Sequence, residues 1–380
     1  MTGLVILAWV LVFYLQFERP YLSALSQNLS PAFLFSFLRH QFFWLAWLTI
    51  PLLALAWKRR RYFCWRLCPV GLLQDLLPSA GKAGLTSFNR AAFLFLAGFS
   101  LFELNLAALF DPLVSFNRAA LALSLRLSLA AVFLLPLGLI CAFSLWRQRW
   151  WCLKLCPLGA IFDWIDRRKN GSRFLDLGRR RALILLGGGI LAGAARRTIL
   201  PFFASAAPRL IRPPGAKPEN EFRDLCLRCG SCVAICPTGG LQPDLSESGL
   251  SGLFTPRLVP RLGECLKDCN RCGQSCPSQA IGYLSMDQKK DFKMGLAKVF
   301  YGRCLSWALD IECRVCERAC PYGTIKARPN RNGTPSPVVS SRICRGCGRC
   351  EKYCPVKPTA AIVVFNLGAG GTIKEIGGER

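Results

Sequence analysis

Sixteen of the 21 cysteines in this 380-residue chain lie between residues 226 and 355, in four quartets that each end in Cys-Pro. The first and last quartets share the spacing C-x2-C-x2-C-x3-C-P, and the two inner quartets are looser variants. Three thiolates on one tight loop can reach three irons of a small cube, while the fourth cysteine opens a helix and points to a neighbouring cluster. The spacing therefore predicts four [4Fe-4S] clusters, held by Cys226, Cys229, Cys232, Cys236, Cys265, Cys269, Cys272, Cys276, Cys304, Cys313, Cys316, Cys320, Cys344, Cys347, Cys350 and Cys354.

Zinc is the main alternative, because zinc ribbons also use C-x2-C pairs. Such a site needs two pairs set well apart and usually some histidine, and the only histidine of the chain is His40. A disulfide scaffold is the remaining possibility. The spacing favours iron–sulfur clusters over both, and so predicts a polyferredoxin in the second half of the chain.

The first half has a different composition. Hydrophobic residues make up 52% of the chain, and the apolar runs lie almost wholly before residue 205. Runs of this length are candidates for membrane helices. The predicted fold class is therefore an all-α membrane domain of about five transmembrane helices, followed by an α+β ferredoxin-like domain with four clusters. The expected spans are residues 3–17, 32–57, 91–110, 121–146 and about 182–203.

The net charge of +27 raises the question of nucleic-acid binding. Four clusters with thiolate ligands are anionic and offset most of the excess in the second half. The excess in the first half flanks the apolar runs, in the loops 58–90 and 147–181. The positive-inside rule places such loops in the cytoplasm. We therefore expect no nucleic-acid partner, a bacterial inner-membrane location, and a ferredoxin domain in the periplasm.

The stretch Arg179–Ala195 combines paired arginines with a weakly hydrophobic, glycine-rich core. It is typical of a twin-arginine export signal, which carries folded proteins across the membrane; an ordinary membrane helix with a basic flank is the alternative. The expected domains are 1–164 (membrane domain), 165–205 (fifth helix), 206–222 (a linker containing RPPGA) and 223–380 (polyferredoxin).

The two basic loops contain an internal repeat. RYFCWRLCPVG at 61–71 matches RWWCLKLCPLG at 149–159, so that Cys64, Cys68, Cys152 and Cys156 occupy equivalent positions. Cysteines at i and i+4 share a helical face. Two such pairs could build one further metal or iron–sulfur site jointly. The alternatives are a packing repeat without redox activity and two separate dithiols.

The paired C-x3-C-P loops resemble membrane ferredoxin proteins of the NapH/MauN type. The second half, from the twin-arginine-like segment through RPPGA and the four quartets, resembles polyferredoxins of the NapG/MauM type. The resemblance implies a fusion of both, which takes electrons from membrane quinol and passes them to a periplasmic cytochrome or reductase. In related four-cluster subunits the quartets pair as nested sets, but the spacing of this sequence leaves nested and sequential pairing open.

Ionisable residues within apolar spans are functional candidates. His40, Glu103 and Arg126 are the candidates for quinol oxidation, with Asp111 and Arg118 at the outer rim. A Glu103–Arg126 ion pair that locks two helices together is the structural alternative. The topology also predicts that the paired cysteine loops lie across about 30 Å of hydrocarbon from the ferredoxin half.

Two function classes follow from these patterns. The first is an electron conduit acting as a quinol dehydrogenase module. The second is a maturation or redox-sensing factor for a periplasmic metalloenzyme. Only the first requires fast, stoichiometric reduction of the clusters by quinol.

Overall fold

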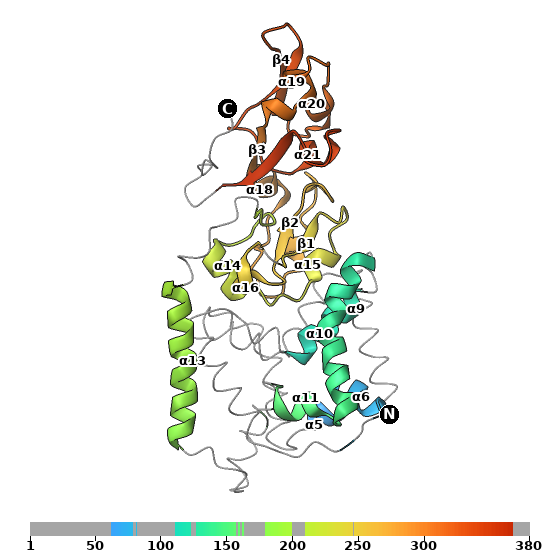
Figure 1. Cartoon of the computed structure of the whole chain (residues 1–380), viewed down its shortest axis with the longest axis vertical. Coiled ribbons are helices and arrows are strands. Elements are labelled where there is room, and N and C mark those ends of the chain that lie inside the picture. The colour runs from blue at the N-terminus through green and yellow to red at the C-terminus, as the bar shows by residue number, and fades with distance from the viewer. Residues whose placement is uncertain are drawn as a thin grey trace. The chain divides into compact units, whose positions relative to one another are not determined.

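The computed structural model describes residues 62–78, 81, 111–122, 127–156, 159, 162, 179–199, 210–245 and 247–367 (Figure 1). The chain divides into two compact units. Unit 1 comprises Met1–Ser205, Pro218–Ala234 and Ser275–Ala280, and unit 2 comprises Ala206–Lys217, Ile235–Gln274 and Ile281–Arg380. The division does not follow the order of the sequence, because parts of the first two cysteine quartets group with the N-terminal half.

The described part of unit 1 is helical. Its helices are α5 (Tyr62–Arg66), α6 (Pro69–Leu76), α9 (Pro112–Ala122), α10 (Leu127–Trp146), α11 (Trp150–Lys154), α13 (Arg179–Ile199), α14 (Glu219–Leu225) and α15 (Ser231–Ala234).

Local sequence sets where two of these helices begin. The Asp111 carboxylate accepts the backbone N–H of Leu113 at 2.8 Å, and Pro112 follows it, so Asp111 caps α9. In the same way Cys68 precedes Pro69 at the start of α6. The proline at each first position needs no hydrogen bond there.

The described part of unit 2 consists of short helices and three antiparallel strand pairs: β1 with β2, β3 with β6 and β4 with β5. The strands are β1 (Leu241–Pro243), β2 (Pro256–Leu258), β3 (Gly295–Val299), β4 (Ile325–Pro329), β5 (Pro335–Val339) and β6 (Ile362–Asn366). The helices are α16 (Gly249–Gly252), α17 (Arg271–Gln274), α18 (Met286–Asp291), η4 (Tyr301–Arg303), α19 (Leu305–Ala308), α20 (Val315–Ala319) and α21 (Arg349–Tyr353). An α+β ferredoxin-like domain is therefore present, as predicted.

The predicted all-α membrane domain requires correction. In the part of the chain that the structure describes, no helix is both long and apolar enough to cross a membrane. A span needs a continuous helix of about 20 apolar residues, and apolar runs in a sequence do not guarantee one. The expected fifth span does contain a helix, α13, which begins at Arg179. The expected spans 3–17, 32–57 and 91–110 lie outside the described residues.

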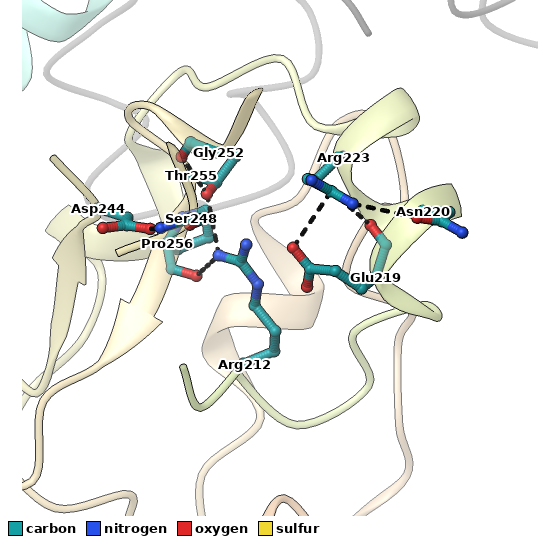
Figure 2. A network of polar contacts seen from close by, with 9 residues as sticks. All are labelled: Arg212, Glu219, Asn220, Arg223, Asp244, Ser248, Gly252, Thr255 and Pro256. Atoms are coloured by element: carbon teal, nitrogen blue, oxygen red, sulfur yellow. Dashed lines mark hydrogen bonds and ion pairs between the residues drawn. The ribbon is translucent and has the colours of Figure 1, made fainter. Parts of the chain in front are cut away.

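The RPPGA segment, expected in a linker, is packed within unit 2. The Arg212 guanidinium donates to the Thr255 hydroxyl at 2.9 Å and to the Pro256 carbonyl at 2.8 Å (Figure 2). Gly215 has φ +82°, and a Cβ there would lie 2.4 Å from the Gly282 carbonyl oxygen. The segment is therefore fixed against two loops of the ferredoxin part, and only glycine fits at its tightest point.

Candidate iron–sulfur cluster sites

One pocket of unit 2 brings cysteines from two quartets together. Cys236, Cys265, Cys269 and Cys272 line one pocket, with Pro213 and Pro214 of the RPPGA segment on its wall. Burial raises the pKa of the Cys272 thiol, and the charges of the other three cysteines raise it further. These four side chains, called site 2 below, are close enough to act on one another.

Two more pockets of unit 2 have the same composition. Site 3 is a pocket whose cysteines are Cys320, Cys344, Cys347 and Cys350. Site 4 is a pocket whose cysteines are Cys304, Cys313, Cys316 and Cys354. Each of the three pockets is therefore lined by four thiols.

The three pockets follow one rule of assembly. Each takes the first three cysteines of one quartet and the fourth cysteine of its sequence neighbour. Sites 3 and 4 exchange Cys320 and Cys354, which are the C-cap residues of α20 and α21. The fourth cysteine of these two quartets therefore ends a helix, whereas the sequence predicted that it opens one. The quartets therefore pair in sequence, third with fourth, and the nested arrangement of related subunits is not adopted.

Site 1 follows from the same exchange. Cys236 belongs to site 2, which leaves Cys226, Cys229 and Cys232 of the first quartet and Cys276 of the second. All four lie in segments of unit 1, Pro218–Ala234 and Ser275–Ala280. Gly230 in the first loop has φ +83°, a conformation that glycine adopts without strain.

The surroundings of these thiols fit a metal cluster. Burial raises the pKa of Cys316 to about 12 and of Cys347 to about 11, so bare thiolates would be unstable there at neutral pH. Coordination to a metal removes the proton instead. Among the described residues no three His, Cys, Asp or Glu side chains are close enough to hold a single metal ion. A [4Fe-4S] cluster spaces its four thiolates more widely than one ion does.

The pKa of Cys320 is shifted in the opposite direction to those of Cys316 and Cys347. Burial raises the pKa of Cys320, but donors to its sulfur outweigh this and lower the pKa overall. The Thr324 hydroxyl lies 3.2 Å and the Thr324 backbone N–H 3.4 Å from the sulfur. Hydrogen bonds to the sulfurs are one of the means by which proteins tune cluster potentials.

Sites 2 and 3 are neighbours within unit 2. The Cys265 backbone N–H donates to the Cys347 carbonyl at 2.8 Å. Burial raises the pKa of Tyr322, and the charges of Cys347 and Cys265 raise it further, so this ring lies near both sites. Sites 2, 3 and 4 thus form a series.

The two copies of the N-terminal repeat also meet. Cys64, Cys68, Cys152 and Cys156 are all buried, with exposed fractions of 2–5%. Burial is the first cause of the raised pKa of Cys156, followed by the charges of Cys152, Cys64 and Cys68. The four thiols therefore form one buried group whose members act on one another, and this group is called the paired-cysteine pocket below.

Side-chain contacts join the segments that carry the two copies of the repeat. The Phe63 and Phe162 rings pack edge to face, with centroids 6.2 Å apart. Arg149 of the second copy donates to both carboxylate oxygens of Asp75 in the first, forming a bidentate ion pair. The second cysteine of each copy also accepts backbone N–H groups, such as that of Gly159 at 3.4 Å from the Cys156 sulfur.

The contacts of helix α9 show that this pocket lies closer to the first cysteine quartet than the sequence predicted. Leu113 of α9 packs in the same core cluster as Cys64, Cys68 and Cys156. Only four residues later, the Asn117 amide donates to the Cys229 carbonyl at 3.1 Å. The predicted separation of about 30 Å of hydrocarbon is therefore wrong for site 1, because one short helix contacts both sites.

Comparisons with known proteins identify the family of the chain. The chain is 38% identical over 228 residues to the methylamine utilization ferredoxin-type protein MauM of Paracoccus denitrificans, which covers 56% of this chain and 96% of that protein. It is 35% identical over 207 residues to the ferredoxin-type protein NapG of Escherichia coli, covering 51% of this chain and 88% of that protein. The chain belongs to the MauM/NapG family of ferredoxin-type proteins. It is therefore an iron–sulfur electron-transfer protein of the ferredoxin type.

Domain comparisons extend to the N-terminal half. A 4Fe-4S dicluster domain matches residues 311–357, and a 4Fe-4S binding domain matches residues 222–242. Another 4Fe-4S binding domain matches residues 40–85 and 129–181, the two segments that contain the paired cysteines. Several 4Fe-4S binding regions are thus present. No solved structure matches this chain.

The predicted quinol residues are not described by the structure. His40, Glu103 and Arg126 lie outside the described residues. Asp111, at the start of α9, and Arg118, within it, are both fully buried; their position at an outer rim stays a prediction. Sequence reasoning missed Arg118 and Asn117 as neighbours of site 1 because no motif links α9 to the first quartet. The RPPGA motif was the available signal for Pro213 and Pro214.

Proposed function

We propose that the chain carries four [4Fe-4S] clusters at sites 1–4 and one further iron–sulfur cluster in the paired-cysteine pocket. When bound, each such cluster accepts and releases one electron. The observation that supports the proposal best is the shared composition of sites 2, 3 and 4. Each has four cysteines, the first three of one quartet and the fourth of a neighbouring quartet.

The protein's own residues prepare these sites. Burial excludes water from the thiols, and loop glycines such as Gly230 and Gly346 adopt the positive φ that the cysteine loops require. Backbone N–H groups at helix starts donate to the sulfurs of Cys68 and Cys156. These contacts favour the thiolate form, which is the form that binds iron.

The proposed electron donor is a quinol, and the proposed acceptor is a periplasmic cytochrome or reductase. Oxidation of one quinol to a quinone releases two electrons and two protons, and the acceptor takes the electrons. The support for this part is the family: the relatives are ferredoxin-type proteins whose names associate one group with methylamine utilization. A periplasmic position of sites 1–4 belongs to the same proposal.

Iron and acid-labile sulfide in the anaerobically purified full chain test the cluster content. We expect about 20 irons with equal sulfide, that is, about sixteen for four cubanes plus about four for the paired-cysteine pocket. About sixteen irons would restrict the clusters to sites 1–4. Zinc with little sulfide would overturn the proposal.

Reduction by a water-soluble quinol tests the donor. When the quinol is mixed with the oxidised protein, the visible absorption of the clusters should decrease rapidly. The decrease should be proportional to the amount of quinol added. Bleaching by dithionite but none by the quinol would contradict a quinol dehydrogenase role and favour maturation or redox sensing.

A further inference from the structure

Helix α9 contacts two cysteine sites at once. Near its start, Leu113 packs among Cys64, Cys68 and Cys156 of the paired-cysteine pocket. Further along, Asn117 and Arg118 reach the loop of the first quartet. Five residues of helix separate Leu113 from Arg118, a rise of about 7.5 Å. Site 1 is therefore the ferredoxin site attached to the paired-cysteine pocket.

Arg118 fixes the backbone of the site 1 loop. Its Nε donates to the Arg228 carbonyl at 2.7 Å, and the adjacent Asn117 amide donates to the Cys229 carbonyl at 3.1 Å. Arg228 has φ +55°, an uncommon conformation for a residue with a side chain. The two donors thus fix the backbone of the loop that carries Cys226 and Cys229.

Two cations are buried beside this loop. Arg118 is fully buried and Arg228 is 1% exposed. Burial, and then the charge of Arg228, lowers the pKa of Arg118 to about 10, whereas the thiolates of Cys229 and Cys226 act in the opposite direction. Buried like charges are unfavourable unless an anion accompanies them. A cluster with four thiolates carries about two negative charges and provides that anion.

The electrostatic surroundings of the other sites differ. At site 2 the buried Lys289 ammonium donates to the Leu266 carbonyl at 3.1 Å and acts on Cys265. At site 4 the charges that act on Cys316 come from Cys304, Cys313 and Cys354. Since a reduced cluster carries one more negative charge, nearby buried cations favour reduction, and net charge is a known determinant of cluster potential.

We propose that Arg118 is a positioning residue that holds the site 1 loop and raises the reduction potential of a cluster at site 1. The proposal rests on the presence of a cluster at site 1. It assigns to site 1 a role in collecting electrons next to the paired-cysteine pocket, within unit 1.

Redox titration of the anaerobically purified full chain, monitored by electron paramagnetic resonance, tests the proposal. Cys229→Ser identifies the site 1 signal. In Arg118→Gln this signal should move to lower potential by at least a tenfold change in its reduction equilibrium, which is about 59 mV for one electron. Arg118→Lys, which retains the charge, should restore most of the potential. Arg331→Gln removes an equal charge from an exposed turn and should shift none of the signals.

Iron content separates the possible failures. If iron is complete and the site 1 potential is the same in Arg118→Gln and wild type, the proposal is overturned while the cluster assignment stands. If wild-type protein contains no cluster at site 1, the proposed function fails first. If Arg118→Gln loses site 1 iron, Arg118→Lys decides. A wild-type site 1 potential in Arg118→Lys supports the role of the charge, and a potential lowered by about 59 mV or more overturns it.

Discussion

The first and last quartets have the same cysteine spacing, yet their surroundings differ. At the first, Arg118 is fully buried and donates to one carbonyl of the cysteine loop. At the last, Arg261 is partly exposed and donates to the carbonyls of Glu351 at 3.1 Å and Cys354 at 2.9 Å. An arginine from another segment donates to each quartet, to the cysteine loop of the first and to the end of α21 in the last, but of these two arginines only the first is shielded from water.

This difference shows that the motif and its environment have separate roles. The spacing selects which thiolates can meet on one cluster, and it is the same in both quartets. The effective dielectric around a nearby cation decides how strongly its charge interacts with the cluster. We therefore expect two clusters of the same chemical type with different potentials, and the changes below test the comparison in order of decreasing effect.

The largest effect is expected from the exchanged fourth cysteines. Cys236→Ser should remove the site 2 cluster and Cys354→Ser the site 4 cluster, each with a loss of about four irons, while the first three cysteines of either quartet keep their own site. Iron analysis with electron paramagnetic resonance of each variant measures this. Cys141→Ser, at a half-buried thiol of α10, is the matched control and should lose none.

Nested pairing gives a different outcome. In that case Cys236→Ser would remove the cluster formed with the last quartet and leave the signal of site 2 intact. Such a result would contradict the pockets described for unit 2.

The paired-cysteine pocket distinguishes the first quartet from the last. Cys64→Ser and Cys152→Ser should each lose about four irons, and the double change should lose no more, because residues that act as one unit are strongly non-additive. Since α9 joins this pocket to site 1, the spectrum of site 1 should change in these variants while that of site 4 does not. Two partial losses that add up would instead indicate separate dithiols.

A third change probes the loop of the last quartet. Gly346 has φ +71°, and a Cβ there would lie 2.4–2.6 Å from the backbone of Gly295. Gly346→Ala should destabilise the protein by more than about 2 kcal/mol, since it combines a clash with backbone strain. Thermal or denaturant unfolding measures this. Gly333→Ala, at φ +85° with open space around it, carries the strain alone and should have a smaller effect.

The smallest effect is expected at Arg261. Arg261→Gln should cost about 1–2 kcal/mol through lost charge-assisted hydrogen bonds, and it should release site 4 iron faster to a chelator. Because water screens this guanidinium, the site 4 potential should change less than the site 1 potential does in Arg118→Gln. Equal shifts in the two variants would remove the distinction between the quartets.

Much of the cofactor chemistry follows from the sequence. Cysteine spacing is a local property, so the four quartets and the two copies of the paired-cysteine repeat can be recognised without a fold. The repeat also predicted the meeting of Cys64, Cys68, Cys152 and Cys156, which the structure brings into one pocket. Their role as ligands stays a prediction, as do the quinol residues His40, Glu103 and Arg126.

Tertiary structure decided what local spacing could not. The partner that supplies each fourth cysteine depends on how the helices after each loop pack, and the gaps between quartets are too similar to reveal it. Apolar composition predicted membrane helices that the described residues do not contain, because composition does not fix the length of a continuous helix. Arg118 lies 110 residues before the carbonyl that it contacts. Its burial beside site 1 arises only when the chain folds. The effect of its charge on site 1 depends on their distance and on the exclusion of water, and neither can be read from the sequence.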